Sequence, residues 1–217
     1  MTTGVHDMRT DDLINALARD PVPALPRVGV LLFRTLAISV PVAFGLMLMT
    51  LGVRDDFAAS CRDGWFVLKL VLVAGVAVAG WAAVKATATP TGAAPIALAG
   101  LVVLAIAAAG IADLGLRGID SWRVRLVGEN AMFCLVSIPF LSVAPLAGII
   151  YALRDGAPTN PALAGAAAGL LSGSLGALLY GLHCTDDSPL FLMVWYVAAI
   201  AMVTGAGALA GRKWLRW

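Results

Sequence analysis

Six long apolar stretches, joined by short polar connections, constrain this chain more than any other feature of its sequence. They cover residues 28–51, 65–86, 93–113, 129–153, 162–182 and 189–211. Each is long enough for a helix to cross a hydrocarbon core about 30 Å thick, which takes roughly 20 residues. Charged residues make up 13% of the chain, whereas soluble domains have about a quarter. We therefore expect an all-α integral membrane protein, built as a six-helix transmembrane bundle.

The other membrane architecture, a β-barrel, requires apolar and polar residues to alternate, and these stretches show no such alternation. The N-terminus reads MTTGVHDMRTDDLINALARDP and lacks the basic start and apolar core of a secretory signal peptide. The first apolar stretch should therefore remain in the membrane. We divide the chain into a cytoplasmic segment (1–27), a transmembrane domain (28–211) and a basic cytoplasmic tail (212–217).

The distribution of basic residues predicts the orientation, because cytoplasmic connections are enriched in Lys and Arg. An even number of spans places both termini on one side. That side carries eight basic residues: Arg9, Arg19, Arg27, Lys85, Arg154, Arg212, Lys213 and Arg216. The other side carries five: Arg54, Arg62, Arg117, Arg123 and Arg125. We expect a multi-pass protein of the bacterial inner (cytoplasmic) membrane with both termini in the cytoplasm.

Ionisable residues are nearly absent from the expected spans. Arg34 and Lys69 lie inside them within about two turns of an end, so we expect both to reach the membrane interface along their aliphatic stems. Pumps and transporters need carboxylates or histidines at mid-membrane. Phosphate loops, H-E-x-x-H and nucleophile elbows are also missing from the sequence. This pattern disfavours an enzyme and favours a regulator; a small metal or ion transporter and a membrane scaffold subunit remain the alternatives.

Small residues recur every four positions in the fifth stretch, at Gly165, Gly169 and Gly173. Small residues on one helix face allow a second backbone to approach closely. We expect this face to pack inside the bundle in preference to forming a dimer. The fourth stretch contains Pro139 and Pro145, which membrane helices tolerate when neighbouring groups satisfy the freed carbonyls.

The N-terminal segment contains one short amphipathic pattern. Leu13, Ile14 and Leu17 form a small apolar stripe at helical spacing, and three prolines follow before the first span. A helix this short is only marginally stable alone, so the stripe suits binding in the groove of a partner protein. The alternative, a helix lying on the membrane surface, fits the pattern equally well. The small net charge of +2 predicts no direct nucleic-acid contact.

Three cysteines fall on the predicted outer side. Cys134 lies near the outer end of the fourth stretch, Cys184 directly follows the fifth, and Cys61 lies in the first outer loop. Cys134 and Cys184 thus have matching depth and form a candidate thiol pair, although buried cysteines commonly act as small apolar residues. Thiolate and imidazole also suit soft metals, which makes His183 an optional further ligand. We expect no permanent cofactor, only a transient heavy-metal ion at Cys134 and Cys184.

The two aspartates that follow Cys184 have a structural interpretation of their own. Asp186 or Asp187, with Ser188 before Pro189, is placed to cap the sixth helix. We therefore expect them to stabilise a helix end and to take no part in chemistry.

Four segments resemble the NrsF-type family of bacterial membrane anti-sigma factors. They are "TDDLINALARD", "CLVSIPFLSVAPL", "ALRDGAPTNPALAGAAAGLLSG" and "LHCTDDSPLFLMVWY". The resemblance implies a six-span inner-membrane protein that holds an extracytoplasmic-function sigma factor at the cytoplasmic face. It also implies that a heavy-metal or oxidative signal acts on two cysteines, here Cys134 and Cys184, and releases the sigma factor to activate a stress response. Cys61 has no counterpart in this pattern.

Overall fold

The computed structural model describes residues 28–88, 96–156 and 158–215, and this part of the chain is helical without strands. The long helices are α2 (Val28–Thr50), α4 (Gly64–Thr87), α5 (Ile96–Arg117), α7 (Ala131–Arg154), α8 (Pro161–Gly181) and α10 (Val197–Trp214). Shorter elements are α3 (Phe57–Ser60), α6 (Trp122–Val127), α9 (Pro189–Phe191) and the π-helical turn η1 (Leu192–Tyr196). The last two elements continue directly into α10.

Six helical stretches are long and apolar enough to cross a membrane, which confirms the predicted number. The ends of two of them differ from the predicted ranges. Helix α5 continues to Arg117, past the expected end at 113, and α10 continues to Trp214. Basic residues occupy both last turns, where they interact favourably with the negative end of the helix dipole. The predicted ranges ended where the apolar run meets a charged residue, whereas helices α5 and α10 continue past that residue.

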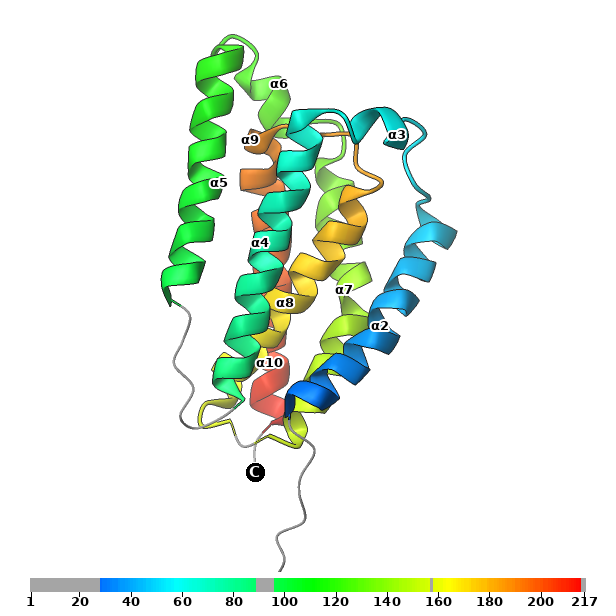
Figure 1. Cartoon of the computed structure of the whole chain (residues 1–217), viewed down its shortest axis with the longest axis vertical. Coiled ribbons are helices and arrows are strands. Elements are labelled where there is room, and N and C mark those ends of the chain that lie inside the picture. Colours follow the sequence, from blue (N-terminus) through cyan, green and yellow to red (C-terminus); the bar gives the residue numbers. More distant parts are fainter. Residues whose placement is uncertain (1–27, 89–95, 157, 216–217) are drawn as a thin grey trace, which may run out of the picture.

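Helix α8 lies at the centre of the bundle (Figure 1). It packs against α10, α4 and α7, while α2 packs mainly on α7 and α5 lies outermost beside α4. Large apolar side chains remain exposed on α2, α5 and the outer face of α7. Such an outward apolar surface is what a bundle in lipid requires, since lipid tails replace water there.

The glycine face of α8 packs inside the bundle, as predicted. Gly165 and Gly169 lie directly against Gly207 and Gly211 of α10, where a Cβ added to Gly165 would come within 2.7 Å of the Gly211 Cα. Side chains cannot fit between the two helices at this crossing. The four glycines therefore set the distance between α8 and α10.

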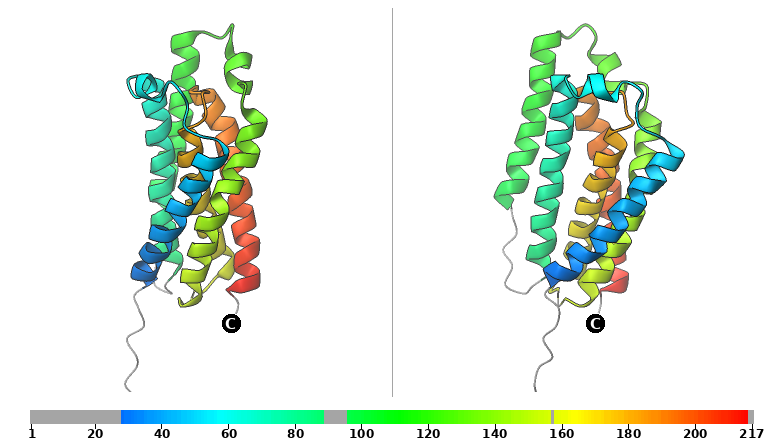
Figure 2. Two further views of the ribbon diagram at one scale, coloured as in Figure 1. Left: turned by 90° about the vertical axis from the view of Figure 1, so that its right-hand side faces the viewer. Right: turned by 45° about the vertical axis from the view of Figure 1, so that its right-hand side comes forward.

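The two ends of the bundle differ in what they carry (Figure 2). The start of α2 and the end of α10 lie at one end, which we call the terminal end (Figure 1). The short elements α3, α6 and α9 lie at the opposite end, together with the turn formed by residues 182–188. We call this opposite end the Cys184 end. The predicted N-terminal segment, with Leu13, Ile14 and Leu17, lies outside the described residues.

The glycine contact predicts the outcome of one matched pair of substitutions. Gly169→Ala should lower the free energy of unfolding by about 1–3 kcal/mol, because its Cβ would lie 2.6 Å from the Thr204 Cα. Gly205→Ala in α10 meets nothing within 4 Å, and should be neutral or stabilising by up to about 1 kcal/mol. Unfolding of the purified proteins in mixed detergent measures both. Equal effects of the two substitutions would contradict the packing.

Candidate functional site

The turn of residues 182–188 connects α8 to α9 and holds Cys184. At its start, the backbone N–H groups of His183 and Cys184 donate to the Tyr180 carbonyl, at 2.9 and 3.0 Å. At its end, the Ser188 hydroxyl accepts a hydrogen bond from the Leu190 N–H and caps α9, with Pro189 at the first helical position. Both ends of the turn are thus fixed by local hydrogen bonds.

Asp187 joins this turn to two basic residues from the other side of the bundle. Its carboxylate accepts from Lys69 Nζ at 2.5 Å and from Arg54 Nη1 at 2.8 Å. Both cations also donate to the Cys184 carbonyl, Lys69 at 3.1 Å and Arg54 at 3.2 Å. The centroid of the Phe66 ring lies 5.3 Å from each of the two charged groups. The backbone of Cys184 is therefore held by two buried or half-buried cations.

The structure corrects two predictions made for these residues. Lys69 does not reach the membrane interface: it is 3% exposed and turns inward to Asp187, because a partner inside the bundle satisfies its charge. The aspartates do not cap the last helix either, since Ser188 takes that role. The partners Lys69 and Asp187 are 118 residues apart, so local sequence patterns could not connect them.

Asp186, unlike Asp187, does not contact these two cations through its carboxylate; it binds the start of α7. Its carboxylate accepts hydrogen bonds from the backbone N–H groups of Glu129 and Asn130 and from the Asn130 side chain, at 2.9 to 3.3 Å. Charge-assisted bonds of this kind are stronger than neutral ones. The two adjacent aspartates therefore tie one turn to α7 on one side and to α4 and Arg54 on the other.

The electrostatics of the exposed part of this network keep it charged at neutral pH. The hydrogen bond from Arg54 lowers the pKa of the Asp56 carboxyl to about 2. The same hydrogen bond raises the pKa of Arg54, against the opposing effect of burial, and Asp187 raises it further. Arg54 therefore stays protonated between its two acidic partners.

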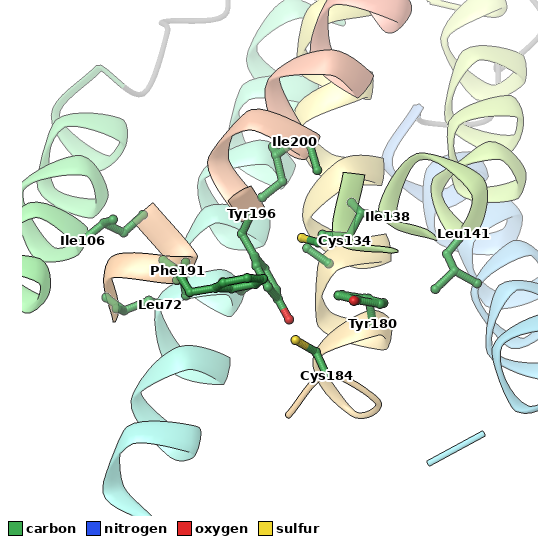
Figure 3. Close-up of a cluster of buried hydrophobic side chains, with 14 of the residues drawn as sticks. Leu72, Ile106, Cys134, Ile138, Leu141, Tyr180, Cys184, Phe191, Tyr196 and Ile200 are labelled. Carbon is green, nitrogen blue, oxygen red and sulfur yellow. The ribbon is translucent and has the colours of Figure 1, made fainter. Parts of the chain in front are cut away.

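The two candidate thiols lie together in one buried cluster. Cys134 on α7 and Cys184 in the turn are both 0% exposed, and their sulfur atoms point toward the ring of Tyr196 (Figure 3). Cys61 is exposed, and all three cysteines are free thiols. Burial raises the pKa of the Cys184 thiol, while the nearby charge of Lys69 acts in the opposite direction. The sequence placed Cys134 and Cys184 at matching depth, and in the structure both belong to one buried cluster.

His183 lies beside this cluster, with its ring centroid 6.0 Å from that of Tyr180. Within residues 28–88, 96–156 and 158–215, no three His, Cys, Asp or Glu side chains are grouped so that they could hold a metal ion. The donor set for a soft cation therefore consists of the two thiols, with no third ligand of these types in place.

Sequence reasoning missed the tyrosines that line the thiol cluster. Tyr180 and Tyr196 are buried beside Cys134 and Cys184, and Tyr196 ends the π-helical turn η1. The sequence feature that could have indicated their role is their spacing: the two tyrosines are sixteen positions apart and flank the Cys184 turn. Trp195 in the same turn donates to the Leu126 carbonyl at 2.8 Å and fixes η1 against α6.

A second buried charge lies nearby, on α5. Asp113 is 0% exposed and pairs with Arg125 at 2.9 Å and with Arg117 at 3.6 Å. An open hollow of about 670 Å³ is lined partly by Arg125 of this pair, by Glu129 and by Asp186 of the Cys184 turn. The hollow therefore places charged groups of both segments beside one another.

Six helices of membrane-spanning length, arranged around α8 with buried thiols at one end, define a polytopic α-helical bundle protein. Residues 17–217 match the family described as "NrsF: Negative regulator of sigma F". The chain belongs to this family of anti-sigma factors, which confirms the resemblance seen in its sequence.

Two named relatives are similar to this chain. The chain is 36% identical over 220 residues to the anti-sigma-F factor NrsF of Caulobacter vibrioides (strain NA1000 / CB15N), covering 97% of this chain and 100% of the relative. It is 39% identical over 90 residues to the probable anti-sigma-F factor NrsF of Azospira oryzae (strain ATCC BAA-33 / DSM 13638 / PS), covering 42% of each. No solved structure matches the chain.

The burial of the thiols predicts their order of reaction with a maleimide. Cys61 should be labelled rapidly in the folded protein, and Cys134 and Cys184 roughly tenfold or more slowly, because they react only after local opening. Mass spectrometry of the full chain in detergent measures the three rates. Unfolding in SDS should expose all three. Labelling of Cys184 as fast as that of Cys61 would contradict the described site.

Proposed function

We propose that this protein is an anti-sigma factor of the bacterial inner membrane that binds an extracytoplasmic-function sigma factor at its cytoplasmic face and releases it under heavy-metal or oxidative stress. Family membership supports the anti-sigma activity. The six apolar helices support insertion in a membrane. The single observation that carries the sensing role is the burial of Cys134 and Cys184 in one cluster.

The proposed orientation places the terminal end in the cytoplasm. Arg154, Arg212 and Lys213 lie in the last turns of α7 and α10 at this end, in keeping with the positive-inside rule. The Cys184 end then faces the periplasm, an oxidising compartment in which a signal acts before it enters the cell.

The thiol pair suits two kinds of signal. A divalent thiophilic cation would replace the two thiol protons and form two sulfur–metal bonds with Cys134 and Cys184, without a change of oxidation state. An oxidant would instead remove two electrons and two protons and leave a disulfide. The fit to a soft cation rests on the two sulfur donors, which belong to one buried cluster. His183, whose ring centroid lies 6.0 Å from that of Tyr180, would supply the optional imidazole of this proposal.

The sigma factor would bind the N-terminal segment, which leads directly into α2. Leu13, Ile14 and Leu17 are the proposed anchors in a groove of the sigma factor. Two or three buried apolar anchors supply most of the energy of such a contact. The start of α2, to which this segment connects in the sequence, and the Cys184 turn lie at opposite ends of the bundle.

Two contacts offer a path between these ends. Asp187 holds Arg54, which follows α2, the helix that continues from the N-terminal segment. Asp186 holds Asn130 at the start of α7, against which α2 packs. A ligand shifts such an equilibrium only by its difference in affinity for the two states. A ligand of Cys184 that displaces the turn would loosen both contacts.

Loss of the two thiols should abolish the response. A Cys134→Ser, Cys184→Ser double variant should retain its sigma factor when cadmium is added, whereas wild type and Cys61→Ser should release it. Transcription from a promoter of that sigma factor measures release in cells. A double variant that responds as the wild type does would refute the sensing role, and metal flux through the wild type in vesicles would favour a transporter.

Charges in the N-terminal stripe should disrupt sigma-factor binding. A Leu13→Asp, Leu17→Asp variant should bind at least about 30-fold more weakly in pull-down, since the loss of even one anchor residue costs about 2 kcal/mol or more. Thr2→Asp, Thr3→Asp adds the same charge outside the stripe and serves as the control. Unchanged binding of the first variant would place the contact elsewhere.

A further inference from the structure

Tyr196 carries a buried hydroxyl group that has no hydrogen-bond partner among the described residues. The side chain is 1% exposed, so solvent does not satisfy the hydroxyl. A polar group left unpaired in the interior costs free energy, and native structures contain few of them. This cost calls for an explanation in terms of another state of the protein.

The position of Tyr196 is set by its surroundings. The ring packs against Phe191 and Tyr180, with centroids 6.1 and 6.0 Å away, and the Lys69 ammonium group lies 6.0 Å above it. The hydroxyl is directed at the sulfur of Cys184 (Figure 3). Tyr196 also ends the π-helical turn η1, and such turns occur frequently at functional sites because they redirect side chains.

The neighbouring polar groups already have partners. Lys69 donates to Asp187 and to the Cys184 carbonyl, and the Tyr180 hydroxyl donates to the Asn130 carbonyl at 3.5 Å. The Cys184 sulfur lies 3.9 Å from the Asp186 carbonyl. Among the buried side-chain polar atoms of the described cluster, the Tyr196 hydroxyl is thus the one without a partner.

The chemistry of sulfur explains why the Tyr196 hydroxyl finds only a weak acceptor in the reduced protein. A neutral thiol is a weak hydrogen-bond acceptor, whereas a sulfur that carries negative charge accepts strongly. Cys184 is a neutral thiol when it is protonated. Its sulfur carries more negative charge when it has lost the proton and ligates a cation. A disulfide sulfur is neutral and offers no such gain.

We propose that Tyr196 is a positioning residue of the sensing centre, and that its hydroxyl donates a hydrogen bond to Cys184 Sγ when Cys134 and Cys184 bind a divalent thiophilic cation. This inference rests on the proposed sensing function. The two thiol protons go to water, two sulfur–metal bonds form, and nothing is oxidised. The cost of the unpaired hydroxyl in the free protein is relieved on binding, so the hydroxyl favours a cation over an oxidant.

Tyr196→Phe tests the proposal because it removes the hydroxyl and keeps the ring. The purified full chain in detergent is titrated with cadmium chloride, and the thiolate-to-cadmium absorption in the ultraviolet reports binding. We expect affinity to fall about tenfold, which corresponds to about 1.4 kcal/mol. The metal-free variant should unfold at the same or a higher temperature than the wild type, since an unpaired buried hydroxyl has been removed.

Weaker cadmium binding without a loss of thermal stability distinguishes a sensing role of Tyr196 from a structural one. Tyr180→Phe is the matched control: it loses a hydroxyl with a partner, so its unfolding temperature should fall and its cadmium affinity should change less. Unchanged affinity in Tyr196→Phe, or a lower unfolding temperature, would overturn the proposal. Failure of the wild type to bind cadmium any better than the Cys134→Ser, Cys184→Ser variant would instead reject metal sensing by this thiol pair.

Discussion

The carboxylate of Asp187, shared between Lys69 and Arg54, is the interaction on which the arrangement of the Cys184 end depends. Burying these charges is costly, and it is tolerated because each has a partner of opposite sign within hydrogen-bonding distance. The same two cations donate to the Cys184 carbonyl. The ion pairs therefore fix the backbone that carries the thiol.

This arrangement gives the Cys184 turn an unusual number of connections for so short a segment. Asp187 reaches Lys69 on α4 and Arg54 after α2, while Asp186 reaches the start of α7. The thiol pair lies beneath these contacts, and the aromatic ring of Tyr196 lies beside it. The Cys184 turn therefore forms a junction of several helices, which is the property that the proposed sensor at one end of a bundle requires.

The sequence predicts the parts of this structure that depend on one segment at a time. Hydropathy identifies the six spans, the spacing of Gly165 and Gly169 identifies a close helix contact, and equal depth brings Cys134 near Cys184. Contacts between distant segments were beyond such reasoning. Lys69 was expected at the interface because a lone lysine in a span usually extends there, and its partner Asp187 lies 118 residues away. Tyr196 was overlooked because its place beside Cys134 depends on the packing of segments far apart in the sequence.

The central claim is that Cys134 and Cys184 act as one buried pair whose reaction releases the sigma factor. Phenylarsine oxide, which bridges two neighbouring thiols, tests it directly when added to the full chain bound to its sigma factor. Mass spectrometry should find one arsenic bridging Cys134 and Cys184, with Cys61 unmodified, at the concentration that releases the sigma factor. Release with arsenic on Cys61, or bridging of the pair without release, would contradict the account.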